Sequence, residues 1–408
     1  MTESLAHAAF ARLRRGLLLL MSVATGLSVA GNYFAQPLLD VIGRELGLGT
    51  TMATLVVAAA QGGYALGLIL LVPLGDLVER RRLAVLLFAA TSVFLLVSAL
   101  ATSGPMLLAG TALTALTSVA AQVVVPYAVT LAAPAERGRV VGTVMAGLLL
   151  GGLLARTASG TLSELGGWRT IYWLNALLVA AVTVLLWRFL PRLHTPIGLS
   201  YPALLRSTVA MFRDEAPLRW RAGIGALSFA AFSVLWTAVT FLLAGPAYGW
   251  GEAAIGLFGL VGAAGAIATP IAGRLADRGW VQRVSGIGTA LLALSWPLIG
   301  LGAVAPGWLV AGVLLFTVAQ QAVLNANQHI IYALRPEARN RINSAFMTAF
   351  FLGGAAGSLL TSAAWTGAGW TGVSLLGGAL SAAAFGLWAL ERMSSNLNRQ
   401  KEEDDHHR

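Results

Sequence analysis

Long runs of apolar residues, separated by short polar connections, recur along the whole chain of 408 residues. A membrane-spanning helix needs about 20 mostly apolar residues, because it rises about 1.5 Å per residue through a hydrocarbon layer about 30 Å thick. Measured against that length, the runs predict an all-α integral membrane protein with twelve transmembrane helices. The expected spans are residues 16–38, 51–74, 82–102, 106–132, 140–162, 170–190, 222–246, 253–273, 284–304, 308–333, 342–364 and 371–390.

Composition supports a membrane location. Hydrophobic residues make up 57% of the chain and charged residues only 11%, and the mean hydropathy is +0.76, whereas a soluble domain carries roughly 25% charged residues. A soluble fold of this size would have to expose much of that apolar surface to water. Cysteine is absent, which excludes disulfides, thiolate metal sites and cysteine catalysis.

The distribution of positive charge predicts the orientation. Arginine gathers in every second connection, and cytoplasmic loops of membrane proteins carry an excess of arginine and lysine. With both termini in the cytoplasm, 24 of the 27 cationic residues lie on the cytoplasmic side. Arg44 and Arg169 would then lie outside, and Arg156 falls within a span.

The longest polar connection, residues 191–221, divides the chain near its midpoint and predicts two six-helix halves, 1–190 and 222–391. Within this linker, the apolar spacing of residues 201–212 predicts an amphipathic helix on the cytoplasmic surface. Residues 392–408 are polar and highly charged, and we expect a disordered cytoplasmic tail.

The two halves repeat one another at a constant offset. The segment Pro134–Arg139 recurs as Pro336–Arg341, and Gly151-Gly152 recurs as Gly353-Gly354, both 202 residues further on. Since six helices return the chain to its starting side, the halves must have the same orientation, as in parallel repeats.

The connection after the second helix of each half carries a related motif. The first copy runs from Val72 to Arg82 and holds Asp76 before three arginines; the second, Gly273–Trp280, holds Asp277 and Arg278. In these residues the chain resembles the major facilitator superfamily, and particularly its bacterial drug:proton antiporter branch. The resemblance implies a fold of two parallel six-helix repeats and secondary active transport by alternating access.

The chain departs from that branch at two points. The arginine expected in the fourth helix, twelve residues before Pro126, is Thr114 here, and the glycine-rich fifth helix lacks the expected Gly-Pro pair. The proton-coupling role of that arginine therefore has no counterpart in this chain.

By the resemblance, the paired motifs form a latch that holds the outward-facing state. A carboxylate in each loop would face the N-terminus of a helix of the other half, Asp76 near Asn343 and Asp277 near Gly142, where the helix dipole favours negative charge. The alternative is a solvated loop that only sets orientation. The expected latch residues are Asp76, Arg80, Arg81, Arg82, Gly273, Asp277 and Arg278.

Arg156 stands out because a charge inside a span is costly and is usually retained for a function. Asp40, near the end of the first helix, lies at a similar depth. A pair between Asp40 and Arg156 that breaks and forms during transport would make Asp40 the coupling carboxylate. The alternative for Arg156 is a side chain that extends to the membrane interface.

Polar residues in helices 1, 4, 7 and 10 are candidates for contact with solute, since these helices line the cleft in the family. Each is also compatible with a plain helix-to-helix hydrogen bond. The candidates are Asn32, Tyr33, Gln36, Gln122, Trp236, Thr237, Gln320, Gln321 and Asn325.

These observations predict a transporter of a small organic solute in the cell inner membrane, working as a monomer by proton-coupled efflux. The alternatives are proton-coupled or facilitated uptake of a polar metabolite and, from another class, a transport-dead receptor or scaffold. No Walker loop, metal-ligand cluster or nucleophile-base set occurs in the sequence. We therefore expect no enzyme activity, no cofactor, no bound metal and no nucleic-acid partner.

Overall fold

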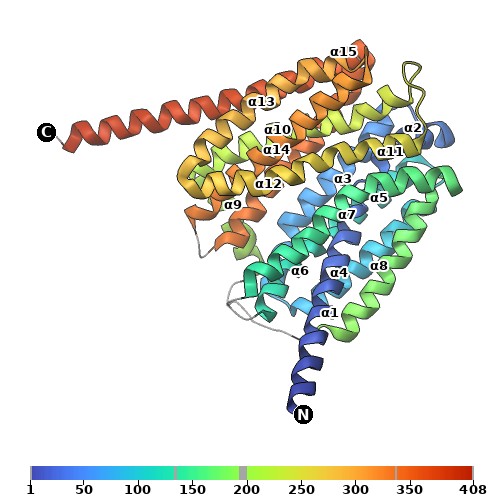
Figure 1. Ribbon diagram of the computed structural model, residues 1–408, viewed down its shortest axis with the longest axis vertical. Helices are drawn as coiled ribbons and strands as arrows, with labels where there is room; N and C mark the ends of the chain where they lie inside the picture. The colour runs from blue at the N-terminus through green and yellow to red at the C-terminus, as the bar shows by residue number, and fades with distance from the viewer. Residues whose placement is uncertain (1, 133–135, 193–199, 336–337, 407–408) are drawn as a thin grey trace. The chain divides into compact units, whose positions relative to one another are not determined.

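The computed structural model describes the backbone of residues 2–132, 136–192, 200–335 and 338–406 (Figure 1). The side chains of residues 2–14, 76, 266–270, 272, 276–277, 339–340 and 395–406 lie outside the description. Within these limits the chain is helical, and its described part contains no β-strand. All twelve predicted spans fall on helical segments, which confirms the predicted all-α class.

Contacts divide the chain into two compact units. Unit 1 comprises residues 1–207 and 243–260, and unit 2 comprises residues 208–242 and 261–408. The helices of unit 1 before the midpoint are α1 (Thr2–Ala30), α2 (Ala35–Leu46), α3 (Thr50–Leu70), α4 (Arg80–Ala99), α5 (Gly104–Ser118), α6 (Ala120–Leu131), α7 (Arg137–Gly166) and α8 (Arg169–Phe189).

The second half of the sequence continues the series. Its helices are α9 (Tyr201–Asp214), α10 (Ala216–Ala244), α11 (Glu252–Phe258), α12 (Ala264–Leu275), α13 (Val281–Leu301), α14 (Pro306–Leu334) and α15 (Arg339–His406). The helix α9 covers the amphipathic segment predicted in the linker. Residues 243–260, which include α11, cluster with unit 1; the division of the sequence at residues 191–221 stays a prediction.

The first predicted span is broken. Instead of one helix over 16–38, α1 ends at Ala30, four residues form turns, and α2 continues to Leu46 at an angle of 40°. Pro37 explains the break, because its ring nitrogen has no hydrogen to donate to the carbonyl of Tyr33. As a consequence Arg44 and Glu45, expected in a loop, belong to α2.

The eighth predicted span is interrupted in its middle. After α11, residues Gly259–Ala263 form a 3-10 turn before α12 begins. A Cβ on Gly259 would lie 2.9 Å from the Cβ of Arg156, so only glycine fits this close approach. Such a 3-10 stretch within a helix often marks strain or a hinge.

The last two predicted spans are one continuous element, α15, with a kink at Ala368 and Gly369. Gly369 has φ of +57°, a left-handed conformation that glycine adopts without a steric penalty. The backbone stays helical to His406, where the sequence predicted a disordered tail. Arginine, glutamine, lysine and glutamate in this segment all favour helix.

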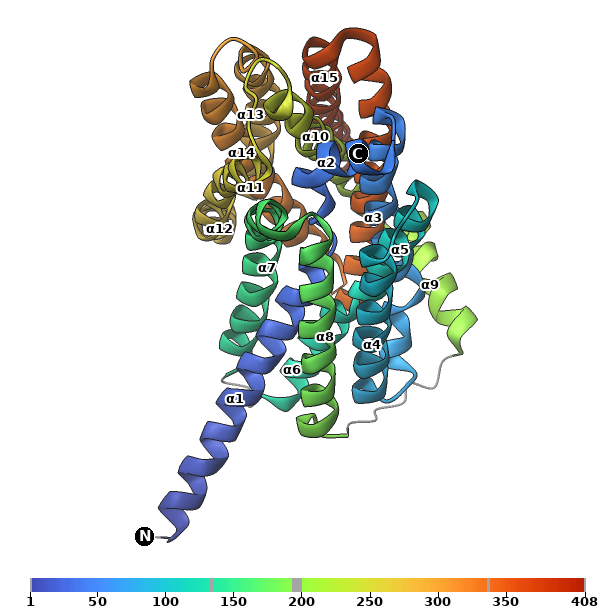
Figure 2. The ribbon, with the colours of Figure 1, turned by 90° about the vertical axis from the view of Figure 1, so that its right-hand side faces the viewer.

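Helices pack in pairs within each unit. In unit 1, α1 packs on α7, α3 on α5 and α4 on α8, and the last four run side by side in Figure 2. In unit 2, α13 packs on α14 and α15, and α12 on α14.

Glycine sets the closest helix approaches in both units. In unit 1, a Cβ on Gly26 of α1 would lie 2.7 Å from the carbonyl oxygen of Gly147 on α7. In unit 2, Gly353 and Gly357 of α15 press against the backbone of α10 at Ala226 and Ala230. Small residues allow such contact between membrane helices, and the packing supports the repeat seen in the sequence.

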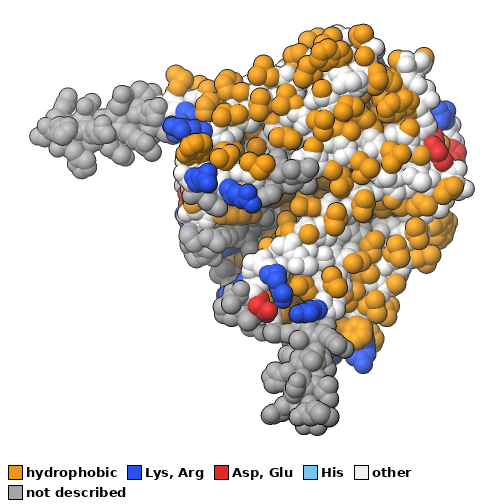
Figure 3. Space-filling view, in the orientation of Figure 1, with side chains coloured by type: hydrophobic (Ala, Val, Ile, Leu, Met, Phe, Trp, Pro, Cys, Tyr) orange, Lys and Arg blue, Asp and Glu red, His pale blue; other side chains and the backbone are white. Residues whose placement is uncertain are grey.

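Nine helices in the described part of the chain are long and apolar enough to cross a membrane, or ten if the bent pair of α1 and α2 is one span. One of these segments, residues 341–394, contains both final predicted spans. Figure 3 shows hydrophobic side chains spread over the face in view, with charged side chains toward its edges. Lipid is the solvent that suits such a surface.

Candidate functional site

Arg156 is buried inside unit 1, with 7% of its surface exposed. Its Nε–H group donates a hydrogen bond of 2.7 Å to the Oε1 atom of Gln36, and its guanidinium lies 4.7 Å from the centre of the Tyr33 ring. Tyr33 lies in the break between α1 and α2, and Gln36 is the second residue of α2. The alternative prediction, an arginine extended to the membrane interface, is therefore wrong for this side chain.

The Tyr33 ring packs against helix α7. A Cβ on Gly152 would lie 3.3 Å from Cε2 of Tyr33, so the ring rests on α7 one helical turn before Arg156. On another side, Gly259 packs against the aliphatic stem of Arg156. Three elements thus hold the guanidinium in one position.

Two further side chains extend this polar region. The Nε2 group of Gln122 donates a hydrogen bond of 3.2 Å to the hydroxyl of Tyr64, and Tyr33 lies near Tyr64. We name Tyr33, Gln36, Tyr64, Gln122 and Arg156 the arginine patch. It joins the α1–α2 break with α3, α6 and α7.

Asn32, the remaining candidate of the first helix, has a structural hydrogen bond. The Ser118 hydroxyl donates to its Oδ1 atom at 3.0 Å, and the Ser28 hydroxyl donates to the carbonyl oxygen of Ser118 at the same distance. These bonds tie α1 to α5 beside the break.

The helix α11 packs against the end of α7 through backbone contacts. A Cβ on Gly256 would lie 2.6 Å from the carbonyl oxygen of Arg156, and the Thr157 hydroxyl donates to the carbonyl oxygen of Gly256 at 3.1 Å. The Glu164 carboxylate accepts a hydrogen bond of 2.9 Å from the N–H group of Ala253. A carboxylate at a helix N-terminus satisfies free N–H groups and complements the helix dipole.

The sequence suggested a pair between Asp40 and Arg156 as a candidate coupling site. In the structure Asp40 pairs instead with Arg44, one turn further along α2. The break after Ala30 starts a new helix in which the two residues lie on one face. Arg44 also reaches Glu252 of α11 at 3.4 Å. Asp40, Arg44, Glu252 and Trp250 line a cavity of about 260 Å³.

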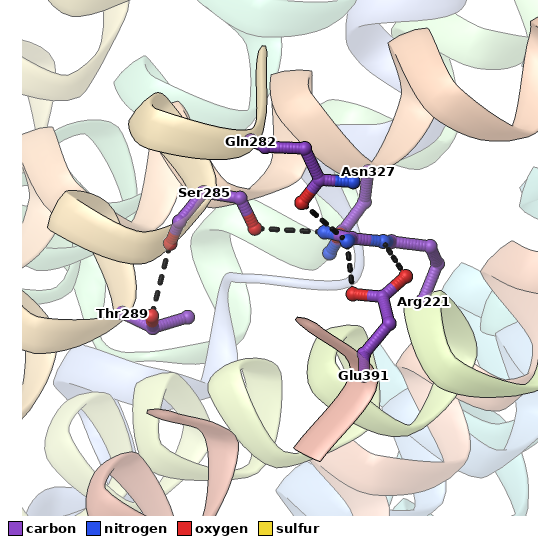
Figure 4. Close-up of polar contacts among 6 residues, drawn as sticks. All are labelled: Arg221, Gln282, Ser285, Thr289, Asn327 and Glu391. Atoms are coloured by element: carbon purple, nitrogen blue, oxygen red, sulfur yellow. Dashed lines mark hydrogen bonds and ion pairs between the residues drawn. The ribbon is translucent and has the colours of Figure 1, made fainter. Parts of the chain in front are cut away.

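Unit 2 contains a second buried arginine, Arg221, at the start of α10. Its guanidinium pairs with Glu391 of α15 and donates hydrogen bonds of 2.8 Å to Ser285 and 2.9 Å to Gln282, both on α13, as Figure 4 shows. The Oδ1 atom of Asn327 on α14 lies 3.5 Å away. Four helices thus meet at one fully buried cation.

This cluster is not among the site residues predicted from the sequence. Arg221 and Glu391 each lie one residue outside an expected span, so neither stands out as a charge within a span. The sequence does contain a signal for this pair. Arg221 directly precedes the seventh expected span and Glu391 directly follows the twelfth, so both lie at the predicted cytoplasmic side.

A sequence model of the Major Facilitator Superfamily matches residues 21–327 and 222–408. Together these two matches cover most of the chain. The chain belongs to the Major Facilitator Superfamily.

Two bacterial relatives of this superfamily member are also described as transporters. The putative uncharacterized transporter YgaY of Escherichia coli (strain K12) is 48% identical over 349 residues, which cover 86% of this chain and 89% of the relative. The probable transporter SCO4007 of Streptomyces coelicolor is 36% identical over 355 residues, covering 85% and 80% respectively.

Solved structures share the superfamily fold. The human organic anion transporter MFSD10 (TETRAN) superposes with a TM-score of 0.70 at 18% identity, covering 92% of this chain and 99% of that one. A bacterial homologue of the human lysosomal transporter Spinster, in an inward-facing and occupied conformation, gives a TM-score of 0.73 at 16% identity, covering 92% and 96%. At such identities the likeness shows the fold alone.

The chain is thus a multi-pass membrane transporter of the superfamily type. Its expected latch stays a prediction, and the contacts described for the latch arginines lie within unit 1. Arg80 donates a hydrogen bond of 3.2 Å to the carbonyl oxygen of Gly75, and Arg81 donates to that of Trp187. Arg82 lines a separate cavity of about 360 Å³. Gly273 lies in α12, and Arg278 directly precedes Gly279, where the backbone leaves the helical conformation. The side chains of Asp76 and Asp277 lie outside the described residues.

The expected solute residues of unit 2 are mostly buried in the transporter. Thr237 exchanges a hydrogen bond of 2.9 Å with Ser358, and Gln320 lies 3.5 Å from Ser228. Trp236 contacts Phe232, while Gln321 and Asn325 are partly exposed. Their contact with solute stays a prediction.

Proposed function

We propose that this transporter is a proton-coupled exporter of a small organic solute, working by alternating access as a monomer in the bacterial inner membrane. Both termini lie in the cytoplasm in this proposal, because that orientation puts 24 of the 27 cationic residues inside. The resemblance of its Asp76 and Asp277 loops to the drug:proton antiporter branch supports export.

The observation that carries the proposal is the bridge between Asp40, Arg44 and Glu252. Asp40 has a side chain that is 33% exposed, and it lines a cavity, so water can reach its carboxylate. Its partner Arg44 also holds Glu252 of α11. A proton that binds Asp40 removes the charge that positions Arg44, and so weakens the link to α11.

In this mechanism the contact of α7 with α11 is the outer gate. Proton binding at Asp40 loosens it, α11 moves away from α7, and the solute held at the arginine patch is released to the outside. The paired loops at the inner side, with Asp76, Arg80, Arg81, Arg82, Gly273, Asp277 and Arg278, form the opposite latch.

The test uses proteoliposomes that enclose a pH-sensitive dye, with a panel of organic anions, cations and neutral metabolites outside and wild-type protein in the membrane. We expect solute-driven proton movement that is lost in Asp40→Asn. The matched control is Glu45→Gln, which removes a second, exposed carboxylate on the same helix and should keep the flux.

The other possible results of this assay support different functions. Solute and proton moving in the same direction would support uptake by symport, and solute movement without protons would support facilitated diffusion. Proton flux that survives in Asp40→Asn would contradict the assignment of Asp40. No solute movement with any compound of the panel would favour a receptor or scaffold.

A further inference from the structure

We propose that unit 1 binds an anionic phospholipid at the predicted cytoplasmic ends of α4 and α8. Arg82 and Arg192 hold the phosphate of this lipid, and one of its acyl chains lies along α4. The site goes beyond the proposed export, because no part of it depends on the solute or on protons.

The lipid site is the cavity of about 360 Å³ that is lined by the start of α4 and the end of α8. Both helices are long and apolar enough to cross a membrane, and they pack against each other (Figure 2). Arg81 and Arg82 are the second and third residues of α4, and Trp187 is the third residue from the end of α8. The cavity therefore lies where two spans end, at the depth of the lipid headgroups, where tryptophan is enriched.

The lining of this cavity carries an excess of positive charge. Among its described residues are three arginines, Arg81, Arg82 and Arg192, and one carboxylate, that of Glu79. A guanidinium matches phosphate oxygens with planar pairs of N–H groups, and basic pockets between membrane helices at the cytoplasmic side bind anionic headgroups. Charge complementarity thus favours an anionic phospholipid over a zwitterionic one.

The three arginines have different parts in this site. The guanidinium of Arg81 donates a hydrogen bond to the carbonyl oxygen of Trp187, which ties the start of α4 to the end of α8 and fixes one positive charge. Arg82 and Arg192 are exposed, so a headgroup in the interface can reach both. A phosphate bound by these two residues joins α4 to the start of the polar connection after α8.

The apolar part of the lining continues along α4. Leu86 lines the cavity and is 57% exposed, and Val93 and Leu100 follow at intervals of seven residues, each 55% exposed. Seven residues are close to two helical turns, so these side chains form one exposed apolar stripe. An acyl chain can lie along this stripe, whereas a free phosphate ion makes no use of it.

The experiment compares two lipids with the same chains and different headgroups, dioleoyl phosphatidylglycerol and dioleoyl phosphatidylcholine. The full chain is purified in a nonionic detergent and titrated with each lipid, and native mass spectrometry measures the fraction of protein that carries one lipid. We expect wild type to bind phosphatidylglycerol about tenfold more tightly, because the choline group brings a positive charge toward the arginines.

Two variants locate the preference. The double variant Arg82→Gln with Arg192→Gln should lose most of it, and because both residues are exposed, the fold should persist. The matched control is Arg188→Gln, an exposed arginine at the same end of α8 that does not line the cavity, and it should behave as wild type. The ratio between the lipids is read within each variant, so a loss of folded protein does not imitate the result.

Competition at constant ionic strength tests whether the occupant is a lipid. Inorganic phosphate and glycerol 3-phosphate, at the concentration of the lipid, should leave phosphatidylglycerol bound, because neither contacts the apolar stripe. Displacement by either compound would assign the cavity to a soluble phosphate and overturn the lipid site. Equal binding of the two lipids to wild type, a preference that survives in the double variant, or an equal loss in Arg188→Gln would overturn it as well.

Discussion

Arg156 of unit 1 and Arg221 of unit 2 are both buried arginines in a membrane-embedded protein, yet their environments differ. Arg221 has a carboxylate partner and several oxygen acceptors from three other helices. Arg156 has a neutral amide and a ring face among its described contacts. The Arg221 cluster joins four helices of unit 2, whereas Arg156 joins α7 to the break between α1 and α2 in unit 1.

The largest effect is expected where the compensated pair is broken. Arg221→Ala leaves Glu391 buried without its partner, which typically costs about 3–5 kcal/mol. We expect a large loss of folded protein, measured by fluorescence-detected size-exclusion chromatography and thermal unfolding. The double variant Arg221→Met with Glu391→Leu removes both charges and should recover most of the stability.

If Arg221→Ala were as stable as wild type, the cluster would not hold unit 2 together, and the contrast with Arg156 would collapse. Loss of transport with full stability would instead assign Arg221 a functional part.

The second prediction concerns the other arginine. Arg156→Gln removes the hydrogen bond that Nε donates to Gln36 and the contact with the Tyr33 ring, so thermal stability should fall by about 1.5–3 kcal/mol, less than in Arg221→Ala. The transport rate should fall about tenfold or more, because the loss of one hydrogen bond to a charged group corresponds to at least that factor. A variant that unfolds while the few remaining folded molecules transport normally would reverse the roles of the two residues.

A smaller effect is expected at the contact between α7 and α11. In Gly256→Leu the new side chain would collide with the backbone of Arg156 and should push α11 away. Because the chain has no cysteine, a single Ser163→Cys reporter on α7 can measure accessibility to a membrane-impermeant thiol reagent. We expect labelling about fivefold faster, the change that corresponds to roughly 1 kcal/mol.

The matched control for this prediction is Gly138→Leu on the same helix, where a Cβ would meet open space. Equal labelling rates in both variants would mean that the contact of α7 with α11 does not govern access.

The smallest effect is expected at Arg44, whose side chain is 64% exposed. Exposed ion pairs contribute about 0–1 kcal/mol and weaken with salt. Arg44→Gln should therefore change thermal unfolding very little at any salt concentration, while the pH dependence of transport should shift. A large destabilisation that persists at high salt would contradict a regulatory bridge and indicate a structural one.

The sequence predicted the helical architecture well, because lipid imposes a fixed length on apolar runs. It also identified Arg156, since a charge in such a run is conspicuous. The break between α1 and α2 was not predicted, although Pro37 marks it. The prediction used only the length of the apolar run, which takes no account of the backbone N–H group that proline lacks.

Pairings were harder to predict than positions. The hydrogen-bond partner of Arg156 depends on the direction of α2 after the break. In the observed direction Arg156 bonds to Gln36, and Asp40 pairs with Arg44. The cluster at Arg221 joins residues 170 positions apart, which only the packing of α10 against α15 brings together. Local spacing contains no information on such distant contacts.

The most direct test of the central claim is the response of solute movement to an imposed pH gradient. If one proton enters for each solute molecule that leaves, a tenfold proton gradient contributes about 1.4 kcal/mol to export. In proteoliposomes with such a gradient, a solute of the panel should be moved against its own concentration gradient toward the acidic side. Movement that does not respond to the pH gradient would contradict proton-coupled export.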